Sequence, residues 1–390
     1  MFDVAVDLVG SKSESNRALM IGYYGGFTPH VKNLSESDDT KLLNGIINKI
    51  GDKRIIDCQN AGTVLRFLAT ALVFRVGDWI LTGSDRMLQR PVGDLVDALR
   101  TMGADIEYMG QDGFPPLKIH GNNIVETHGR ASLPIHIDIT RSSQFASSIL
   151  LAMPVVETRH GTSLHLGGDL SSLPYIDMTI DMMRKFGADV HRDGRDIFLQ
   201  PSDYKDVEYT VESDWTCASY WYEIVAFSEN GRARLRNLHL DSKQGDAIVA
   251  KWFEQFGVMS VQDGNDVIIE KSVETFSETS QNNHNCVLQF DFINNPDLYP
   301  TIAATCAGLN VEGRFTGLRN LAHKESDRVA AMNMELSKKN IFDSHNDHRI
   351  AMALAPLAMK IGAIEINNAD VVSKSYPNYW KEVQKITPNL

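Results

Sequence analysis

Seven basic residues stand in short motifs of small polar residues, at apparent helix starts or in loops. They are Lys12, Arg17, Arg90, Lys324, Arg328, Arg349 and Lys374. Arginine offers a fork of N–H donors that fits phosphate or carboxylate, and lysine adds a compact positive charge. If these residues converge, the site binds two multiply charged anions. Asp297 and Glu325 are then the carboxylates available to move protons.

Three motifs could place backbone N–H groups around an anion. Gly10–Arg17 precedes an apolar run, as does Asn60–Thr63, in which Gly62 lets a ligand approach the backbone. Ser142-Ser143-Gln144 opens a helix of small residues and suits a phosphate or a polyol. Each motif also reads as an ordinary capped helix start, so one motif alone does not decide between capping and binding.

Composition narrows the class of protein. The chain has 390 residues, 43% of them hydrophobic and 23% charged, which excludes a disordered or low-complexity protein. The formal charge of −12 argues against a nucleic-acid partner, although a cleft on an acidic protein can be locally basic. We predict no metal site, because His345 and His348 lack a third ligand at a suitable spacing. A serine hydrolase is poorly supported, since GxSxG is absent.

The expected location is the cytoplasm. Residues 1–7 contain acids and no basic region of the kind that opens a signal peptide. No apolar run approaches the length of about 20 residues that a membrane span needs. The four cysteines are predicted to be reduced thiols, since none forms a CxxC pair; they are Cys58, Cys217, Cys286 and Cys306.

A weak internal repeat predicts α/β layers. An amphipathic helix ends at a glycine and a strand follows, first over 95–108, then over 176–191 and 247–261, with a poorer copy at 42–51. In the second and third copies an Asp-Gly turn and another strand come next, which indicates a hairpin. The repeating unit is therefore helix, strand, turn, strand.

The motifs together resemble those of the EPSP synthase family of enolpyruvyl transferases. Matching segments run in family order over nearly the whole chain. They are Gly10–Arg17, Ser37–Thr40, Asn60–Arg66, Leu81–Arg100, Ser142–Phe145, Ser172–Tyr175, Gln244–Asp246, Pro296–Asp297, Lys324–Arg328, Asn346–Arg349 and Lys374–Pro377. So many matches in order make the resemblance specific.

The resemblance implies an α/β fold of two domains, each built from three βαβαββ units, with an active-site cleft between the domains. We place one domain at 11–213, and the other, discontinuous, at 1–10 plus 214–390. It also implies a monomer without metal or organic cofactor. Its partners would be two small anionic substrates, with neither nucleic acid nor membrane involved.

The activity implied is transfer of the enolpyruvyl group of phosphoenolpyruvate to the 5-hydroxyl of shikimate 3-phosphate, with release of phosphate, in the shikimate pathway to chorismate and aromatic amino acids. The catalytic residues implied are Asp297, the proton acceptor, Glu325, at the methylene carbon, and Lys12. The expected shikimate 3-phosphate ligands are Lys12, Ser13, Arg17, Ser142, Ser143, Gln144, Ser172, Tyr175, Asp297, Asn320 and Lys324. The expected phosphoenolpyruvate ligands are Lys12, Asn60, Gly62, Arg90, Gln144, Arg328, Arg349 and Lys374.

Two departures from the family pattern matter. Phe67 follows Arg66 where many members have proline, which leaves open how strongly glyphosate, the family's herbicide, binds. Arg141 precedes the serine pair, where it could strengthen phosphate binding or face solvent. Two other functions stay open. A UDP-N-acetylglucosamine enolpyruvyl transferase would normally use a loop Cys or Asp near the donor, and a non-catalytic anion-binding descendant would have lost some of the catalytic residues.

Overall fold

The computed structural model describes residues 2–51, 54–122, 134–155, 162–272 and 287–386, which form two compact units. Unit 1 comprises Met1–Lys12, Asn33–Asp38 and Val211–Leu390, and unit 2 comprises Ser13–Lys32 and Asp39–Thr210. Asn33–Asp38 thus groups with unit 1, whereas the sequence-based limits include it in domain 11–213. Those domain limits stay a prediction.

Unit 2 contains two four-stranded sheets of the same topology. In each, two parallel strands are joined by a helix, and a second helix leads into an antiparallel hairpin, which is the predicted βαβαββ pattern. The first sheet is formed by β3 (Ile55–Asp57), β4 (Gly77–Thr82), β5 (Asp105–Tyr108) and β6 (Leu117–Gly121), with α3 (Gly62–Val73) and α4 (Gly93–Thr101). The second is formed by β7 (Ile135–Asp138), β8 (Thr162–Gly167), β9 (Val190–Asp193) and β10 (Asp196–Leu199), with α5 (Ser143–Ala152) and α6 (Leu173–Lys185).

The rest of unit 2 is a shorter element of the same kind. Its strands are β2 (Val31–Lys32) and β11 (Tyr209–Thr210), which pair in parallel. Its helices are α1 (Lys12–Gly25) and α2 (Asp38–Ile47), and the first residue of each groups with unit 1. The poorer repeat copy at 42–51 departs from the predicted form, because β3 begins only at Ile55 and Gly51 is not among the glycines with positive φ.

Unit 1 repeats the pattern once in full. Its four-stranded sheet is formed by β1 (Phe2–Val6), β12 (Gly231–Leu235), β13 (Val258–Asp263) and β14 (Asp266–Lys271), with α7 (Trp215–Phe227) and α8 (Val249–Phe253). Two parallel pairs follow: β15 (Leu288–Asp291) with β16 (Gly313–Thr316), and β17 (Ile341–Asp343) with β18 (Glu365–Asn367). The accompanying helices are α10 (Tyr299–Leu309), α11 (Arg328–Leu336), α12 (His348–Leu354), α13 (Ala358–Ile361) and α14 (Tyr379–Val383).

The predicted glycine stops and Asp-Gly hairpins are confirmed. Gly103, Gly187 and Gly257 follow their helices with φ of +93°, +94° and +75°, a conformation that glycine adopts without steric cost. Gly194 and Gly264 occupy the hairpin turns with φ of +56° and +62°. The alternating strands on either side then pair in the expected antiparallel register.

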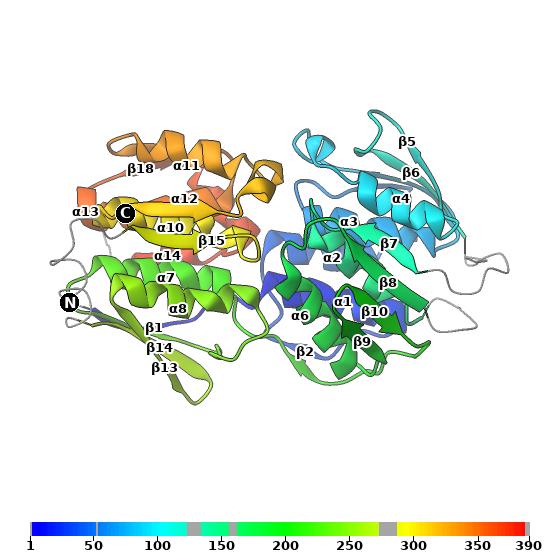
Figure 1. Cartoon of the computed structure of the whole chain (residues 1–390), viewed down its shortest axis with the longest axis horizontal. Coiled ribbons are helices and arrows are strands. Elements are labelled where there is room, and N and C mark those ends of the chain that lie inside the picture. The colour runs from blue at the N-terminus through cyan, green and yellow to red at the C-terminus, as the bar shows by residue number, and fades with distance from the viewer. Residues whose placement is uncertain (1, 52–53, 123–133, 156–161, 273–286, 387–390) are drawn as a thin grey trace. The chain divides into compact units, whose positions relative to one another are not determined.

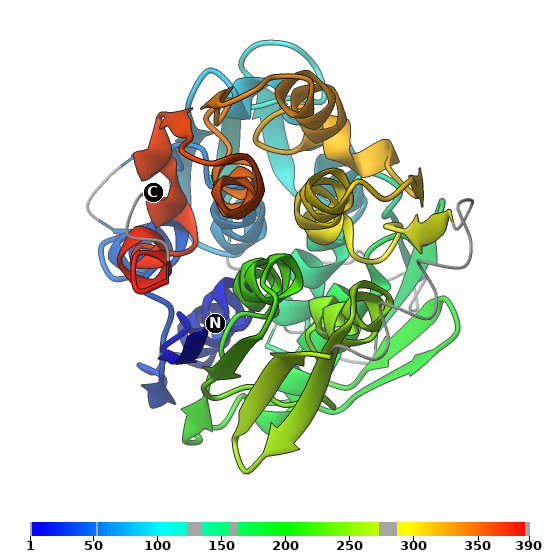
Figure 2. The ribbon, with the colours of Figure 1, turned by 90° about the vertical axis from the view of Figure 1, so that its left-hand side faces the viewer.

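Helices that are apolar nearly all round form the inside of each unit. In unit 1, α7, α10 and α12 pack side by side, and Figures 1 and 2 show the strands of that unit outside them. In unit 2, α5 packs against both α3 and α6. A helix without a polar face must be covered on all sides, so the sheets and amphipathic helices lie outside.

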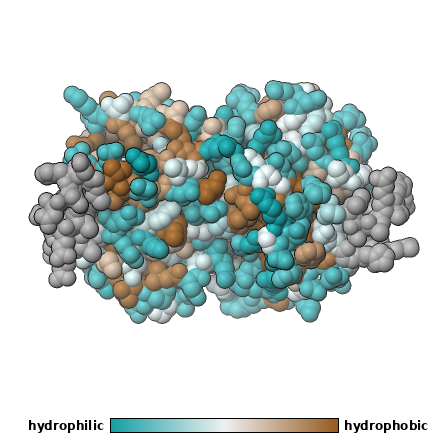
Figure 3. Space-filling model, viewed as in Figure 1, coloured by the Kyte–Doolittle hydropathy of each residue, from teal (hydrophilic) through white to brown (hydrophobic). Residues whose placement is uncertain are grey.

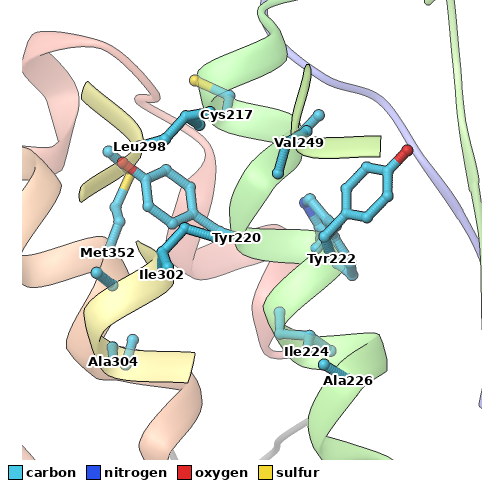
Figure 4. Close-up of a cluster of buried hydrophobic side chains, with 14 of the residues drawn as sticks. Cys217, Tyr220, Tyr222, Ile224, Ala226, Val249, Leu298, Ile302, Ala304 and Met352 are labelled. Carbon is cyan, nitrogen blue, oxygen red and sulfur yellow. The ribbon is translucent and has the colours of Figure 1, made fainter. Parts of the chain in front are cut away.

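The centre of unit 1 is rich in aromatic side chains. Tyr220 of α7 points toward Leu298, Ile302 and Met352, while Tyr222 points to the other side of the helix, beside Val249 (Figure 4). All of these side chains are buried. Burying them stabilises the position of α7 relative to α10 and α12, by about 1.5–3 kcal/mol for each large side chain.

On the face shown in Figure 3, the surface of each unit is mostly hydrophilic, with hydrophobic residues in small groups. Small apolar groups are normal on a folded surface. Within the described ranges, no helix is both long enough and apolar enough to cross a membrane.

Candidate functional site

The predicted anion-binding motifs lie in the turns that lead into the inner helices. α1 begins at Lys12, α3 at Gly62, α5 at Ser143 and α12 at His348. Asp297 lies in the helical turn Pro296–Leu298, directly before α10. The same arrangement recurs at these positions: an inner helix begins shortly after a strand has ended, and its first N–H groups favour a nearby negative charge.

In unit 2, Arg17 is buried and held by the protein itself. Its Nε donates to the Thr179 hydroxyl at 2.7 Å, and Nη2 donates to the Ser147 hydroxyl and the Tyr175 carbonyl, each at 3.1 Å. Nη1 donates to the Ser13 carbonyl at 2.9 Å. Burial lowers the pKa of Arg17 to about 10, so it stays cationic at neutral pH. These four bonds fix the guanidinium and leave one of its five donors for a ligand.

Two guanidinium groups surround Gly62. A Cβ on this glycine would lie 2.5 Å from Nη1 of Arg66 and 2.6 and 2.7 Å from the terminal nitrogens of Arg90. Arg90 also donates to the Asn60 carbonyl at 3.4 Å. Three of the predicted phosphoenolpyruvate ligands therefore lie together. Arg66 lies beside them and was not selected from the sequence, although it stands within the Asn60–Arg66 motif.

Gln144 joins the α5 start to the α3 start. Its side-chain oxygen accepts from Arg66 at 2.8 Å, and its side-chain nitrogen donates to the Thr63 hydroxyl at 2.9 Å. The Ser142 hydroxyl caps α5 by accepting from the Gln144 N–H at 3.2 Å. The start of α5 is therefore capped by Ser142 and also lies close to the arginines.

The remaining predicted residues of unit 2 stand at the start of α6. Ser172, with φ of +55°, is buried directly before the helix. Tyr175 lies in the first turn, and its carbonyl accepts from Arg17.

Arg141, shortly before α5, lies 3.4 Å from both carboxylate oxygens of Asp94 and is half exposed. Its charge is therefore paired with a carboxylate of the neighbouring helix α4.

In unit 1, Asp297 is the centre of a buried ion-pair network. Its Oδ1 lies 3.1 Å from Nζ of Lys324 and 2.7 Å from Nη1 of Arg328, and its Oδ2 lies 2.8 Å from Nη2 of Arg349. Burial raises the pKa of this carboxyl, but Arg349, Lys324 and Arg328 together outweigh burial and bring the pKa well below its ordinary value. Asp297 is therefore ionised at neutral pH.

Glu325 extends the network to Lys374. Its Oε2 accepts from Nη2 of Arg328 at 3.0 Å, and its Oε1 lies 3.3 Å from Nζ of Lys374. Both carboxylates are thus bound to cations that were themselves predicted to bind substrate. Asn320 is also buried in this unit, within the helical turn Arg319–His323.

Asp347, which sequence reasoning did not select, is the third carboxylate of the network. Its Oδ2 accepts from Nε of Arg328 at 2.8 Å, and its Oδ1 accepts from Nη2 of Arg328 at 3.2 Å and from the Arg349 N–H at 3.0 Å. Burial disfavours the Arg328 cation, but Asp347, Asp297 and Glu325 outweigh burial and raise its pKa. The only signal in the sequence was its place beside His348 and Arg349.

Asp246 is a second carboxylate that sequence reasoning did not select. It is buried, and it accepts from the Thr216 hydroxyl at 2.5 Å and from the Asn295 amide at 3.3 Å. Burial and the negative charge of Asp297 raise the pKa of Asp246 to about 6. It therefore supports the turn that carries Asp297.

Lys12, Cys217 and His348 lie close enough together to interact electrostatically in unit 1. The Lys12 N–H donates to Oδ2 of Asp214, the residue directly before α7, at 3.3 Å. Burial raises the pKa of the Cys217 thiol well above its usual value, which keeps it neutral. Burial, Lys12 and Arg349 lower the pKa of His348, so its imidazole is neutral as well. Cys217 and His348 are thus uncharged, and the charges of this region are carried by lysine, arginine, aspartate and glutamate side chains.

The fold is that of an α/β protein of the enolpyruvyl-transferase type. Two solved structures of EPSP synthase from Acinetobacter baumannii share the fold with TM-scores of 0.72 and 0.73. Their sequences are 23% and 22% identical to this chain. Each match spans 98% of this chain, and 95% and 96% of the respective Acinetobacter chains.

Sequence comparisons then give the family. The family model for EPSP synthase (3-phosphoshikimate 1-carboxyvinyltransferase) matches residues 47–342 and 338–383. A protein of that name from Bacteroides fragilis (strain YCH46) is 37% identical, over 97% of this chain and 94% of its own length. One from Vibrio cholerae serotype O1 (strain M66-2) is 32% identical, over 98% and 96%. The chain belongs to the EPSP synthase family and is a transferase.

Proposed function

We propose that this protein transfers the enolpyruvyl group of phosphoenolpyruvate to the 5-hydroxyl of shikimate 3-phosphate and releases phosphate. The observation that carries the proposal is the Asp297 centre, where one carboxylate contacts Lys324, Arg328 and Arg349. An arrangement of this kind can bind anionic substrates and place a proton acceptor among them. We also propose that the protein is a cytoplasmic monomer.

The proposed substrate ligands fall on both units. The shikimate 3-phosphate ligands are Lys12, Ser13, Arg17, Ser142, Ser143, Gln144, Ser172, Tyr175, Asp297, Asn320 and Lys324. The phosphoenolpyruvate ligands are Lys12, Asn60, Gly62, Arg90, Gln144, Arg328, Arg349 and Lys374, to which the contacts of Arg66 with Gln144 add Arg66. Arginine pairs suit the carboxylate and phosphate of the donor, because each can be bound by two parallel N–H bonds.

The reaction needs two proton transfers in its addition step. The 5-oxygen loses its proton and bonds to the central carbon of phosphoenolpyruvate, while the methylene carbon gains a proton and becomes a methyl group. In the elimination step that methyl group loses a proton, the bond to the phosphate oxygen breaks, and the double bond reforms. We assign the proton of the 5-hydroxyl to Asp297. Glu325 starts in its protonated form, gives its proton to the methylene carbon in the addition and takes one back from the methyl group in the elimination, while the proton on Asp297 leaves with the phosphate. Lys12 lies beside the reacting groups.

Because the pKa of Asp297 is low, we propose that substrate binding raises it and so makes Asp297 a stronger base. Arg349, Lys324 and Arg328 stabilise the ionised form, so in the network described above Asp297 is a weak base. Substrate phosphate and carboxylate groups compete for the same three cations. As they bind, the positive charge acting on Asp297 falls and its pKa moves toward the range useful for proton transfer.

The test is phosphate release by the purified protein. We expect release only when shikimate 3-phosphate and phosphoenolpyruvate are both present. A requirement for UDP-N-acetylglucosamine in place of shikimate 3-phosphate would identify the other transferase, which the family match does not favour. Binding of both substrates without any release would identify a non-catalytic descendant.

A further inference from the structure

The turn before α12 has an unfavourable backbone conformation, which contacts with other residues must stabilise. His345 and Asn346 are consecutive and have φ of +52° and +54°, in the left-handed region that non-glycine residues seldom occupy. The turn leads directly to Asp347 and Arg349. Asp347 binds Arg328 and the Arg349 N–H, and Arg349 contacts Asp297. The position of Arg349 thus depends on a strained turn.

Glu335, in the last turn of α11, contacts this turn directly. Its Oε2 accepts the Asp343 N–H at 2.8 Å, and its Oε1 lies 2.6 Å from Nε2 of His345. Nζ of Lys338 donates to both oxygens, at 2.8 and 2.7 Å. Asp343 adds a second bond, since its Oδ1 accepts the His345 N–H at 2.6 Å.

The carboxylate of Glu335 is completely buried, yet the proposed reaction does not use it. Burial raises its pKa, but Lys338, the Asp343 N–H and His345 outweigh burial and lower it, so Glu335 is an anion with several donors around it. Burying a carboxylate is costly unless its partners are well placed. The fold therefore holds these donors in one geometry.

The two ends of α11 hold the same segment. At its start, Arg328 binds Asp347 through Nε at 2.8 Å and Nη2 at 3.2 Å. At its end, Glu335 binds the backbone of Asp343 and the side chain of His345. Residues 343–347 are thus fastened to one helix at two points.

We infer that Glu335 is a positioning residue for the donor-binding side of the site: it holds the turn at 343–346 so that Asp347 and Arg349 are correctly placed. The inference rests on the proposed function where it assigns Arg349 to phosphoenolpyruvate. It assigns no contact between Glu335 and either substrate.

The kinetic test uses Glu335→Ala, with Glu382→Ala as its matched control. Glu382 is buried in the same unit and pairs with Lys385 at i+3 and 2.6 Å, as Glu335 pairs with Lys338. Within the described part of the chain it has no hydrogen bond or ion pair with the turn at 343–346. We expect kcat/KM for phosphoenolpyruvate to fall about 10- to 100-fold in Glu335→Ala, the effect of misplacing one charge-assisted hydrogen bond. KM for shikimate 3-phosphate should stay within about twofold, and Glu382→Ala should change neither value.

Two further variants keep the inference testable if Glu335→Ala does not fold. Glu335→Gln keeps the shape and one acceptor oxygen and should recover part of the loss. His345→Ala removes a single partner of Glu335 from a partly exposed position and should lower kcat/KM for phosphoenolpyruvate in the same direction. Equal losses for both substrates, or losses matched by Glu382→Ala, would mean that Glu335 only stabilises the fold.

Hydrogen–deuterium exchange without substrates tests the same inference independently of catalysis. The amides of residues 343–347 should exchange slowly in the wild type and much faster in the Glu335 variants, while the rest of unit 1 keeps its protection. If the wild type releases no phosphate, the proposed function fails and this measurement still decides the role of Glu335. Unchanged exchange in residues 343–347 would overturn the inference.

Discussion

At the scale of single residues, Asp297 shows how neighbours decide chemistry. A carboxylate after a strand could have been an ordinary ion-pair partner, and the structure places three cations within 3.1 Å of it. Their combined effect exceeds that of burial, so the pKa falls where burial alone would raise it. An anionic group that binds those three cations would therefore make Asp297 more basic.

We expect Asp297→Asn and Glu325→Gln to lower kcat by roughly 10²–10⁴-fold, the usual size of general acid–base catalysis, while substrate binding largely survives. Steady-state kinetics at saturating substrates measures this. Asp327→Asn is the control, because Asp327 caps α11 through the Ala330 N–H, a bond that asparagine also makes. Near-normal kcat in both variants would defeat the assignment and leave Lys12 as the next candidate for the 5-hydroxyl proton.

We expect Gly62→Ala to weaken donor binding. The new methyl group would lie 2.5–2.7 Å from nitrogens of Arg66 and Arg90 and must displace them. KM for phosphoenolpyruvate should rise about tenfold or more, the cost of disturbing one charged contact, with little change for shikimate 3-phosphate.

Gly45→Ala is the control for Gly62→Ala, since a Cβ on Gly45 of α2 meets nothing within 4 Å. Glyphosate, as an anionic mimic of the donor, should compete with phosphoenolpyruvate in the wild type. Inhibition that does not depend on donor concentration would contradict a shared site.

At the scale of elements, α7 carries an acid that the proposed reaction leaves unused. Glu223 is completely buried, and neither carboxyl oxygen has a hydrogen-bond partner among the described residues. Burial raises its pKa well above the ordinary value, so the folded protein holds it protonated at neutral pH. Unfolded, the same side chain ionises near pH 4.3.

We expect this acid to destabilise the protein increasingly as pH rises. Above the unfolded pKa the folded state binds more protons than the unfolded state, so the free energy of unfolding falls with pH, by up to about 1.4 kcal/mol per unit. Glu223→Gln removes this dependence. Its stability relative to wild type should increase between pH 5 and 8 in denaturant melts, whereas exposed Glu229→Gln should show no such trend. Parallel pH profiles for Glu223→Gln and wild type would show that Glu223 does not titrate on unfolding.

At the scale of the whole molecule, the proposed substrate ligands divide between the two units: Arg17, Arg90 and Ser142 belong to unit 2, and Lys324, Arg349 and Lys374 to unit 1. Without ligands, basic groups repel one another, and bound phosphates can bridge them. We expect shikimate 3-phosphate plus a donor analogue to reduce the radius of gyration in small-angle scattering. An unchanged scattering profile at saturation would argue against ligand-driven closure.

The sequence by itself determined the local elements. Apolar runs predicted the inner helices, and the glycines at 103, 187 and 257 marked the ends of the amphipathic helices, because left-handed backbone at a helix end is a local property of one residue. Alternating runs around Asp-Gly likewise determined two hairpins. The motifs that carry charge were visible for the same reason, since each lies within a few consecutive residues.

Only the tertiary structure decided which charges meet. Asp297, Arg328, Arg349 and Asp347 come from three separate parts of the chain, and Glu335 reaches the turn at 343–345 through space. The sequence left the direction of the Asp297 pKa open and passed over Arg66, Asp246 and Asp347. Electrostatic energy depends on distance and burial, and folding sets both by bringing distant segments together.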